Sequence, residues 1–204
     1  MGFGYVFLGC LLTVNIPYHN YTDVFAVALI LFGLSTLAPY ARGFSLAFKA
    51  GLPLLGVGFL SFFAEILRLI GLWSAPALLF SLLSIVMLIG KFFFYWFLFM
   101  GVDEVARETD IPKLRAHAMR SRFLTPIFCA MGLFLEAGLF SQHDVFLQYF
   151  LLAFILFGVI YALLNCKTVY ECYMLICFEG DENMDEKPPR FSFARGKKEK
   201  GEKK

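Results

Sequence analysis

Six long and nearly uninterrupted apolar stretches constrain this chain more than any other feature of its sequence. A helix needs about 20 apolar residues to cross a bilayer, with a range of roughly 17–25. Four of the stretches reach that length, while the first two are shorter and are expected to thin the bilayer locally or to draw interfacial residues inward. The stretches cover residues 2–16, 24–37, 51–72, 77–100, 123–140 and 145–164.

The character of these stretches favours helices over strands. Each stretch is continuously apolar, whereas the strands of a membrane barrel alternate between apolar and polar residues. Backbone groups inside hydrocarbon must be satisfied within the segment, which leaves helices. The chain is 59% hydrophobic and contains 26 Phe, more than a small soluble core can hide. The sequence therefore predicts an all-α, polytopic integral membrane protein, with a bundle of about six transmembrane helices over residues 1–178.

The distribution of basic residues predicts the orientation. Fifteen of the 18 Lys and Arg residues fall on one side of a six-span arrangement: two in 38–50, five in 101–122 and eight in 178–204. The loops on the opposite side contain none. Cytoplasmic loops of membrane proteins are enriched in Lys and Arg. We therefore expect both termini to be cytoplasmic, and we expect the protein to lie in a bacterial cell membrane.

The last apolar stretch continues beyond the expected membrane boundary. Val169, Tyr173 and Ile176 fall on one helical face. This pattern predicts a cytoplasmic helical extension of the last span, covered by the segment 111–122. Residues 179–204 carry an acidic block and then a basic one, and are expected to form a disordered tail. The tail's basic end is a candidate for binding anionic lipid headgroups, and we expect no nucleic acid partner.

The sequence contains no motif typical of an enzyme or a metal site. It lacks G-x-S-x-G, H-E-x-x-H and a phosphate-binding glycine loop. Its five cysteines have no C-x-x-C spacing and are expected to be small packing residues. We therefore expect no catalytic residue, no bound cofactor and no metal.

Ionisable side chains within the apolar stretches are the strongest candidates for function, since they are costly in a bilayer. Glu65 and Arg68 are three residues apart and can form an ion pair on one helical face. Glu136 and Lys91 lie in two other stretches. An outward-facing polar cluster, with a solute or cation site at the mouth of a cavity, can be drawn from Asn15, His19, Glu65, Arg68, Glu136, His143 and Asp144. The competing interpretation is a structural ion pair with polar residues that anchor helix ends.

Two functions follow as hypotheses. The first is a non-enzymatic structural, regulatory or partner-binding membrane protein, which would bind a protein through its cytoplasmic face. The alternative is a small transporter or channel for a small solute or cation, assembled as a homo-oligomer, with Glu65, Arg68 and Glu136 near its pathway. The sequence favours the first and names neither the ligand nor the partner.

Overall fold

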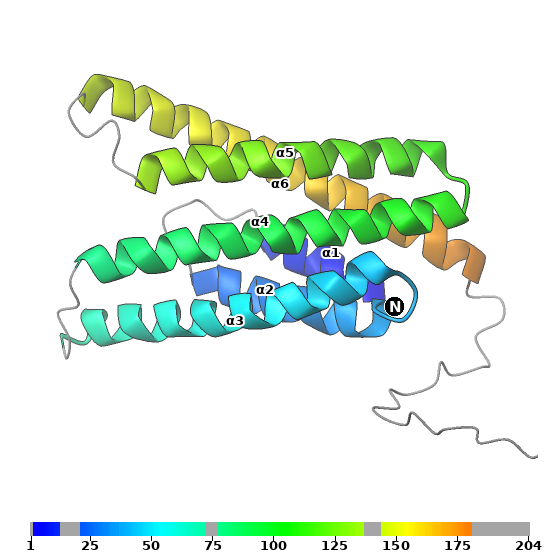
Figure 1. The fold of residues 1–204 in the computed structure, drawn as a ribbon, viewed down its shortest axis with the longest axis horizontal. Coiled ribbons are helices and arrows are strands. Elements are labelled where there is room, and N and C mark those ends of the chain that lie inside the picture. Colours follow the sequence, from blue (N-terminus) through cyan, green and yellow to red (C-terminus); the bar gives the residue numbers. More distant parts are fainter. Residues whose placement is uncertain (1, 13–20, 72–76, 137–143, 181–204) are drawn as a thin grey trace, which may run out of the picture.

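The computed structural model describes residues 2–12, 21–71, 77–136 and 144–180. Six helices and no strand occur in this part of the chain, so the all-helical prediction is confirmed. Figure 1 shows the helices running roughly parallel to one long axis, with successive helices pointing in opposite directions. They are α1 (Gly2–Leu12), α2 (Tyr21–Leu37), α3 (Arg42–Leu69), α4 (Ala77–Glu108), α5 (Pro112–Glu136) and α6 (Asp144–Gly180).

Four of the described helices, α3 to α6, are long and apolar enough to cross a membrane. They contain 28, 32, 25 and 37 residues. At 1.5 Å per residue they are about 37–55 Å long, against a hydrocarbon thickness of about 30 Å. This length and apolarity indicate an integral membrane protein. α1 and α2 contain 11 and 17 residues, so they reach only about 16 and 25 Å.

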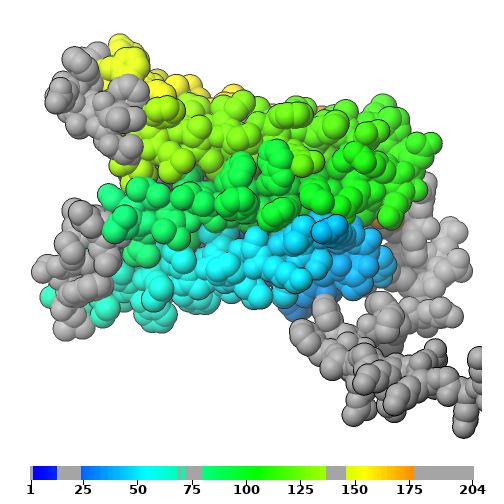
Figure 2. Space-filling view, in the orientation of Figure 1, coloured from blue at the N-terminus to red at the C-terminus, as the bar shows by residue number. Residues whose placement is uncertain are grey.

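The helices pack in the order of the chain, and α6 packs back against α1 to close the arrangement. In Figure 1, α3, α4 and α5 lie in a row from bottom to top, and Figure 2 shows the same three helices side by side on one face. The contact of α1 with α6 includes a ring pair, Phe7 and Tyr170, whose centroids are 5.6 Å apart. Across the centre, Tyr95 of α4 and Tyr161 of α6 meet edge to face at 6.3 Å.

Small residues let the helices approach closely, as is common between helices in membranes. A Cβ on Gly43 of α3 would lie 2.2 Å from the backbone nitrogen of Gly101 of α4. A Cβ on Gly33 of α2 would lie 2.5 Å from the carbonyl oxygen of Gly2 of α1. Both contacts are with backbone, which cannot swing aside, so these glycines fix how near the paired helices lie.

The hairpin of α1 and α2 covers only part of the bundle's length. Val24, near the start of α2, lies opposite the middle of α3, because a Cβ on Gly58 would be 3.3 Å from a Val24 methyl group and 3.7 Å from Met87 of α4. From Gly58, α3 continues through eleven further residues to Leu69, about 16 Å. Over that last section, α3 presents the exposed side chains of Phe59, Leu60, Phe63 and Leu67.

The predicted extension of α6 is part of one continuous helix that reaches Gly180. Val169 is buried, as the pattern predicted, and Ile176 packs against the core. Leu114 and Ala118 of α5 are buried in the same cluster, in agreement with a cover by the segment 111–122. Tyr173 differs: it is 41% exposed and lies beside α1, within 3.8 Å of the Cβ position of Gly4. α1 therefore covers a face of α6 that the sequence pattern assigned to α5 alone.

Candidate functional site at one end of the bundle

Polar contacts in the described residues concentrate at one end of the bundle. This end contains the start of α3, the turn between α4 and α5, and the last third of α6, at the right of Figure 1. The turn is short because Asp110 adopts a left-handed conformation, with φ of 52°, and the Ile111 N–H donates to the Ala106 carbonyl 3.0 Å away. This is the hydrogen bond of a helix C-terminal motif, and Pro112 begins α5 directly after it.

Asp103 near the end of α4 is the most deeply buried carboxylate of the described helices, with 6% of its surface exposed. One oxygen lies 3.0 Å from an Arg107 nitrogen, one turn further along α4. The other lies 3.4 Å from Arg115 Nε of α5, an ion pair without hydrogen-bond geometry. Both arginines remain about half exposed, at 57% and 48% of their side chains. Asp103 thus joins the end of α4 to the beginning of α5.

Glu104, the next residue, joins α4 to α3. Its Oε2 accepts a hydrogen bond from the Gly43 N–H at 2.8 Å. The first turn of a helix has N–H groups without partners inside the helix, and a carboxylate there is also favoured by the helix dipole. Ala41 precedes α3 and makes no side-chain cap. Glu104 therefore supplies from a neighbouring helix the cap that the α3 sequence lacks.

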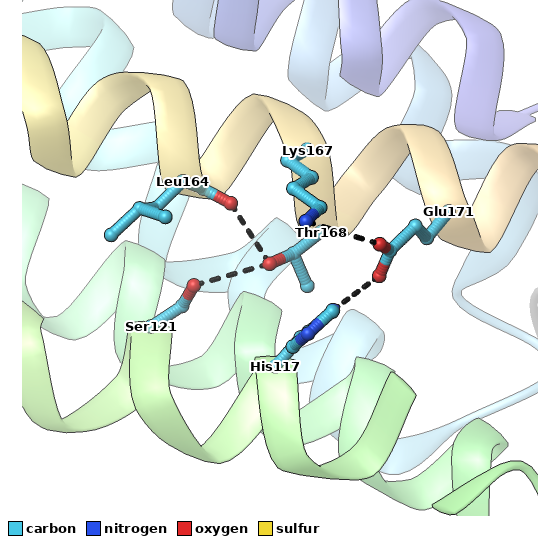
Figure 3. Close-up of polar contacts among 6 residues, drawn as sticks. All are labelled: His117, Ser121, Leu164, Lys167, Thr168 and Glu171. Atoms are coloured by element: carbon cyan, nitrogen blue, oxygen red, sulfur yellow. Dashed lines mark hydrogen bonds and ion pairs between the residues drawn. The ribbon is translucent and has the colours of Figure 1, made fainter. Parts of the chain in front are cut away.

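A third tie joins α5 to α6, and Figure 3 shows its residues. His117 Nδ1 contacts one carboxylate oxygen of Glu171, and Lys167 Nζ lies 3.9 Å from the other. His117 and Glu171 are each about three-quarters buried, while Lys167 is mostly exposed. The carboxylate is therefore held from both sides, by a residue of its own helix and by one from α5.

Two hydroxyl pairs extend this tie along the interface of α5 and α6. Thr168 donates to the Leu164 carbonyl at 2.9 Å, so the 3.3 Å contact between Ser121 and Thr168 is donated by Ser121. Thr125 likewise donates to the Ser121 carbonyl at 2.9 Å, so at the 2.8 Å contact between Thr125 and Tyr161 the tyrosine is the donor. Each hydroxyl hydrogen thus has an acceptor in a ladder that runs from His117 to Tyr161.

The ladder ends at Tyr161. The Phe128 ring stacks on Tyr161 with centroids 5.0 Å apart, and Phe154 stacks on Phe128 at 5.1 Å. Asn165 lies one helical turn from Tyr161 and is 3% exposed, and its amide oxygen has no hydrogen-bond partner within the described helices. An unsatisfied buried acceptor costs about 1–3 kcal/mol. The polar interface therefore occupies one half of the α5–α6 contact, and the other half is aromatic.

Two further arginines mark the point at which α5 changes from basic to apolar. The Arg122 guanidinium lies over the Trp96 ring, 4.2 Å from its centroid, and Phe123 begins the apolar run. Tryptophan is enriched at membrane interfaces. Nε of Arg122, and Nε and Nη2 of Arg120, are buried and have no hydrogen-bond acceptor in the part of the chain that is described.

The four residues singled out in the sequence lie away from this end, on three helices. Glu65 and Arg68 of α3 are 3.9 Å apart, and Arg68, with 61% of its side chain exposed, also lies 5.7 Å from the Phe80 ring centroid of α4. Lys91 is partly buried in α4. Glu136 is the last residue of α5 and is exposed. The structure thus brings Glu65 and Arg68 within ion-pair distance.

The depth of Glu136 follows from the packing of α5 on α4. A Cβ on Gly132 would lie 2.8 Å from Leu88, so Glu136, one turn later, is near the level of Ser84. That level is seven residues, or about 10 Å, inside the start of α4 at Ala77. Of the remaining residues of the expected outward cluster, Asn15, His19 and His143 lie outside the described residues, as does the side chain of Asp144.

The sequence contained a signal for the α5–α6 ladder that hydropathy alone did not reveal. His117, Ser121 and Thr125 recur every fourth residue of α5. Tyr161, Asn165 and Thr168 follow the same helical spacing in α6. A search for polar residues that share one helical face would have predicted two matching stripes. Asp103 and Glu104 gave no such signal, since a charged pair at the end of an apolar run is typical of a solvated helix end.

The arrangement is built to hold helices together. A catalytic triad would need a serine within hydrogen-bond reach of the histidine nitrogen opposite the carboxylate. Ser121 is instead fully buried and bonded to Thr168. Among residues 2–12, 21–71, 77–136 and 144–180, no three His, Cys, Asp or Glu side chains are placed to hold a metal ion.

No protein-family model, curated protein or solved structure matches this chain. The assignment of a function therefore starts from its own residues.

Proposed function

We propose that this chain is a non-enzymatic integral membrane protein that binds a protein partner at its cytoplasmic end. The observation that carries the proposal is an apolar surface on the part of α6 that follows Lys167. Tyr170 and Tyr173, which border α1, and Met174 beside them are 39–46% exposed there. At 1.5 Å per residue they lie about 5–12 Å beyond Lys167, where a helix leaves the hydrocarbon. Exposed apolar groups outside the hydrocarbon mark interaction sites.

The polar ties of the same end support a scaffold. They connect α3 to α4, α4 to α5 and α5 to α6 through Glu104, Asp103 and Glu171. A surface that binds a partner gains affinity when it is held rigid before binding, since less conformational freedom is lost. The face of α6 opposite the exposed residues is fastened to α5 by this network, so the exposed residues belong to a rigid element.

The proposed orientation has both termini in the cytoplasm of a bacterial cell, with six helices entering the membrane. It rests on the positive-inside rule: the start of α3 and the α4–α5 turn carry basic residues, eight more follow α6 in the sequence, and these three helix ends lie at one end of the bundle. A green fluorescent protein fused after Lys204 should fluoresce, and alkaline phosphatase fused there should be inactive. Active phosphatase at that position would contradict the orientation.

The partner surface can be tested by photo-crosslinking in cells. A photoreactive phenylalanine analogue replaces Met174, which is 39% exposed. The control places it at Leu156, which is more exposed, at 56%, but lies within the apolar run of α6. We expect a discrete protein adduct from position 174 and none from position 156. The proposal fails if position 174 gives no adduct. It is also wrong if the adduct contains only a second copy of this chain, which would indicate a homo-oligomer.

The alternative is a small transporter or channel, and one observation favours it. Glu136 is exposed about 10 Å inside the outer end of α4, and a carboxylate at that depth needs a partner or water. Glu65 and Arg68 lie towards the same end. If this function holds, Glu65→Gln and Glu136→Gln should abolish solute uptake into liposomes while the protein stays folded. Equal uptake by both variants and the parent protein, or no uptake by any of them, would count against it.

A further inference from the structure

A pocket of about 340 Å³ opens between the end of α4 and the beginning of α5. We infer that it binds the phosphate group of an anionic phospholipid, so that one lipid is held at the bundle's α4–α5 corner. The inference requires only that the helices lie in a bilayer, and it does not depend on the proposed protein partner. The turn that frames the pocket is at the right-hand end of the face shown in Figure 2.

The guanidinium groups of the pocket are paired with a carboxylate before any ligand arrives. Arg107 and Arg115 both line it, and both are held by the buried carboxylate of Asp103 at 3.0 and 3.4 Å. Asp103 contacts one nitrogen of each guanidinium group, and about half of each arginine side chain stays exposed. Arginine presents several N–H donors in a planar fork and suits phosphate recognition for that reason.

The balance of charge favours an anion over a neutral ligand. Arg122 lies two helical turns from Arg115 on the same face of α5, and its buried Nε has no acceptor in the described helices. Arg107 and Arg115 line the pocket and are balanced by the carboxylates of Asp103 and Asp110, so the excess positive charge on this face comes from Arg122, about 10 Å along α5 and outside the pocket lining. The Asp110 carboxylate repels an anion, so removing its charge should strengthen binding, whereas removing an arginine should weaken it.

The position and lining of the pocket favour a lipid over a free anion. Met119, at its membrane-facing edge, is one turn before Phe123, about 6 Å along α5. The headgroup region of each leaflet is about 5–7 Å thick, so the pocket opens at that level. Its remaining walls are apolar: Ala106, Ile111, Pro112 and Ala116. Basic pockets between transmembrane helices on the cytoplasmic side are typical binding sites for anionic headgroups.

The acyl chains of a lipid held there would pass Trp96, whose ring is covered by the Arg122 guanidinium at the edge of the apolar region. Trp96 is therefore a built-in reporter once the other tryptophan is removed by Trp73→Phe. The protein is placed in phosphatidylcholine vesicles that contain phosphatidylglycerol or phosphatidylcholine with brominated chains, which quench tryptophan on contact. We expect brominated phosphatidylglycerol to compete for the site several-fold better than brominated phosphatidylcholine.

Three variants then separate the site from general charge. Arg115→Gln should reduce the preference for phosphatidylglycerol about fivefold, as expected for one basic residue near an anionic headgroup. Asp110→Asn should increase it. Because the Asp110 side chain forms no ion pair or hydrogen bond with the described residues, this variant keeps the test valid even if Arg115→Gln unfolds. Lys113→Gln removes an equal charge from the same turn outside the pocket and should change the preference little.

Each outcome decides the matter. Equal quenching by the two brominated lipids would overturn the inference, and so would equal effects of the variants at positions 113 and 115. Inorganic phosphate in large molar excess over the protein should leave the preference intact. If free phosphate abolishes the preference instead, the pocket takes soluble phosphate and the lipid assignment is wrong. If NaCl at the same ionic strength abolishes the preference, the preference arises from screened surface charge and the inference of a binding pocket is wrong.

Discussion

Asp103 holds two arginines from different helices with one buried carboxylate, so its loss should be felt beyond its own position. Asp103→Asn removes the charge but keeps the shape, and it leaves Arg107 and Arg115 facing each other. We expect the free energy of unfolding to fall by about 1–2 kcal/mol. This is less than the roughly 3–5 kcal/mol lost when a fully buried ion pair is broken, because both arginines are half exposed to solvent. Thermal unfolding in detergent measures it. Glu108→Gln, on the exposed side of the same helix end, is the control and should change little.

The hydrogen bond between Thr125 and Tyr161 can be measured with a double-mutant cycle. Tyr161→Phe and Thr125→Val each remove one hydroxyl from a contact of 2.8 Å that both residues bury. Side-chain hydrogen bonds between membrane helices stabilise them by about 0.6 kcal/mol on average, so we expect a stabilising coupling energy of that size. Thr125→Val also removes the bond to Ser121, and the cycle cancels that effect because it is present in both Thr125→Val proteins. A coupling of zero would mean that the two hydroxyls do not interact.

At the level of residues, the sequence predicted which ionisable side chains are costly but not which polar ones meet. Glu65 and Arg68 could be paired from sequence because their spacing places them on one helical face, and the structure has them 3.9 Å apart. His117 and Glu171 are 54 positions apart, so their contact depends on how α5 and α6 are set against each other. Hydropathy carries no information on that relative position.

Among the helices, α3 and α4 offer a sharp contrast between two glycines. Gly43→Ala places a methyl group 2.2 Å from a backbone atom of Gly101, so the helices must separate and the Glu104 cap must lengthen. Gly56, in the same helix, has nothing within 4 Å of its Cβ position. We expect Gly43→Ala to lower the unfolding temperature clearly. Gly56→Ala should leave it unchanged or raise it, since alanine is the better helix former by about 1 kcal/mol. Equal behaviour of the two variants would contradict the close packing.

The helix boundaries differ from the apolar stretches in one consistent direction. α3 begins at Arg42 and α5 at Pro112, well before the apolar runs that start at residues 51 and 123. α4 likewise continues past residue 100 to Glu108. Hydropathy marks the part of a helix that suits lipid, whereas a helix continues as long as its backbone hydrogen bonds and its neighbours support it. The polar ties lie in these added turns, which is why the sequence placed the candidate site at the opposite end.

For the molecule as a whole, the decisive quantity is the depth that α1 and α2 reach. Two full spans would place Phe25 near the membrane interface at the Leu69 end of α3. Val24 instead packs beside Gly58 and Met87, and the Phe25 ring meets Phe62 with centroids 6.4 Å apart. This places Phe25 about 10–16 Å from the Leu69 end of α3, well inside a bilayer about 30 Å thick. Both arrangements return the chain to the same side, so the basic residues cannot separate them.

Tryptophan depth measurements can separate them. Phe25→Trp and Ile70→Trp are compared in a protein without its native tryptophans, since both positions are more than 60% exposed. We expect bromines near the ends of the acyl chains to quench position 25 most strongly, and bromines near the headgroup to quench position 70. Equal, shallow profiles would show that α2 crosses the whole bilayer. A deep profile at position 25 would mean that six helices fill the leaflet next to the α4–α5 turn and four fill the other leaflet. The Leu69 end of α3 would then border lipid where α2 no longer covers it.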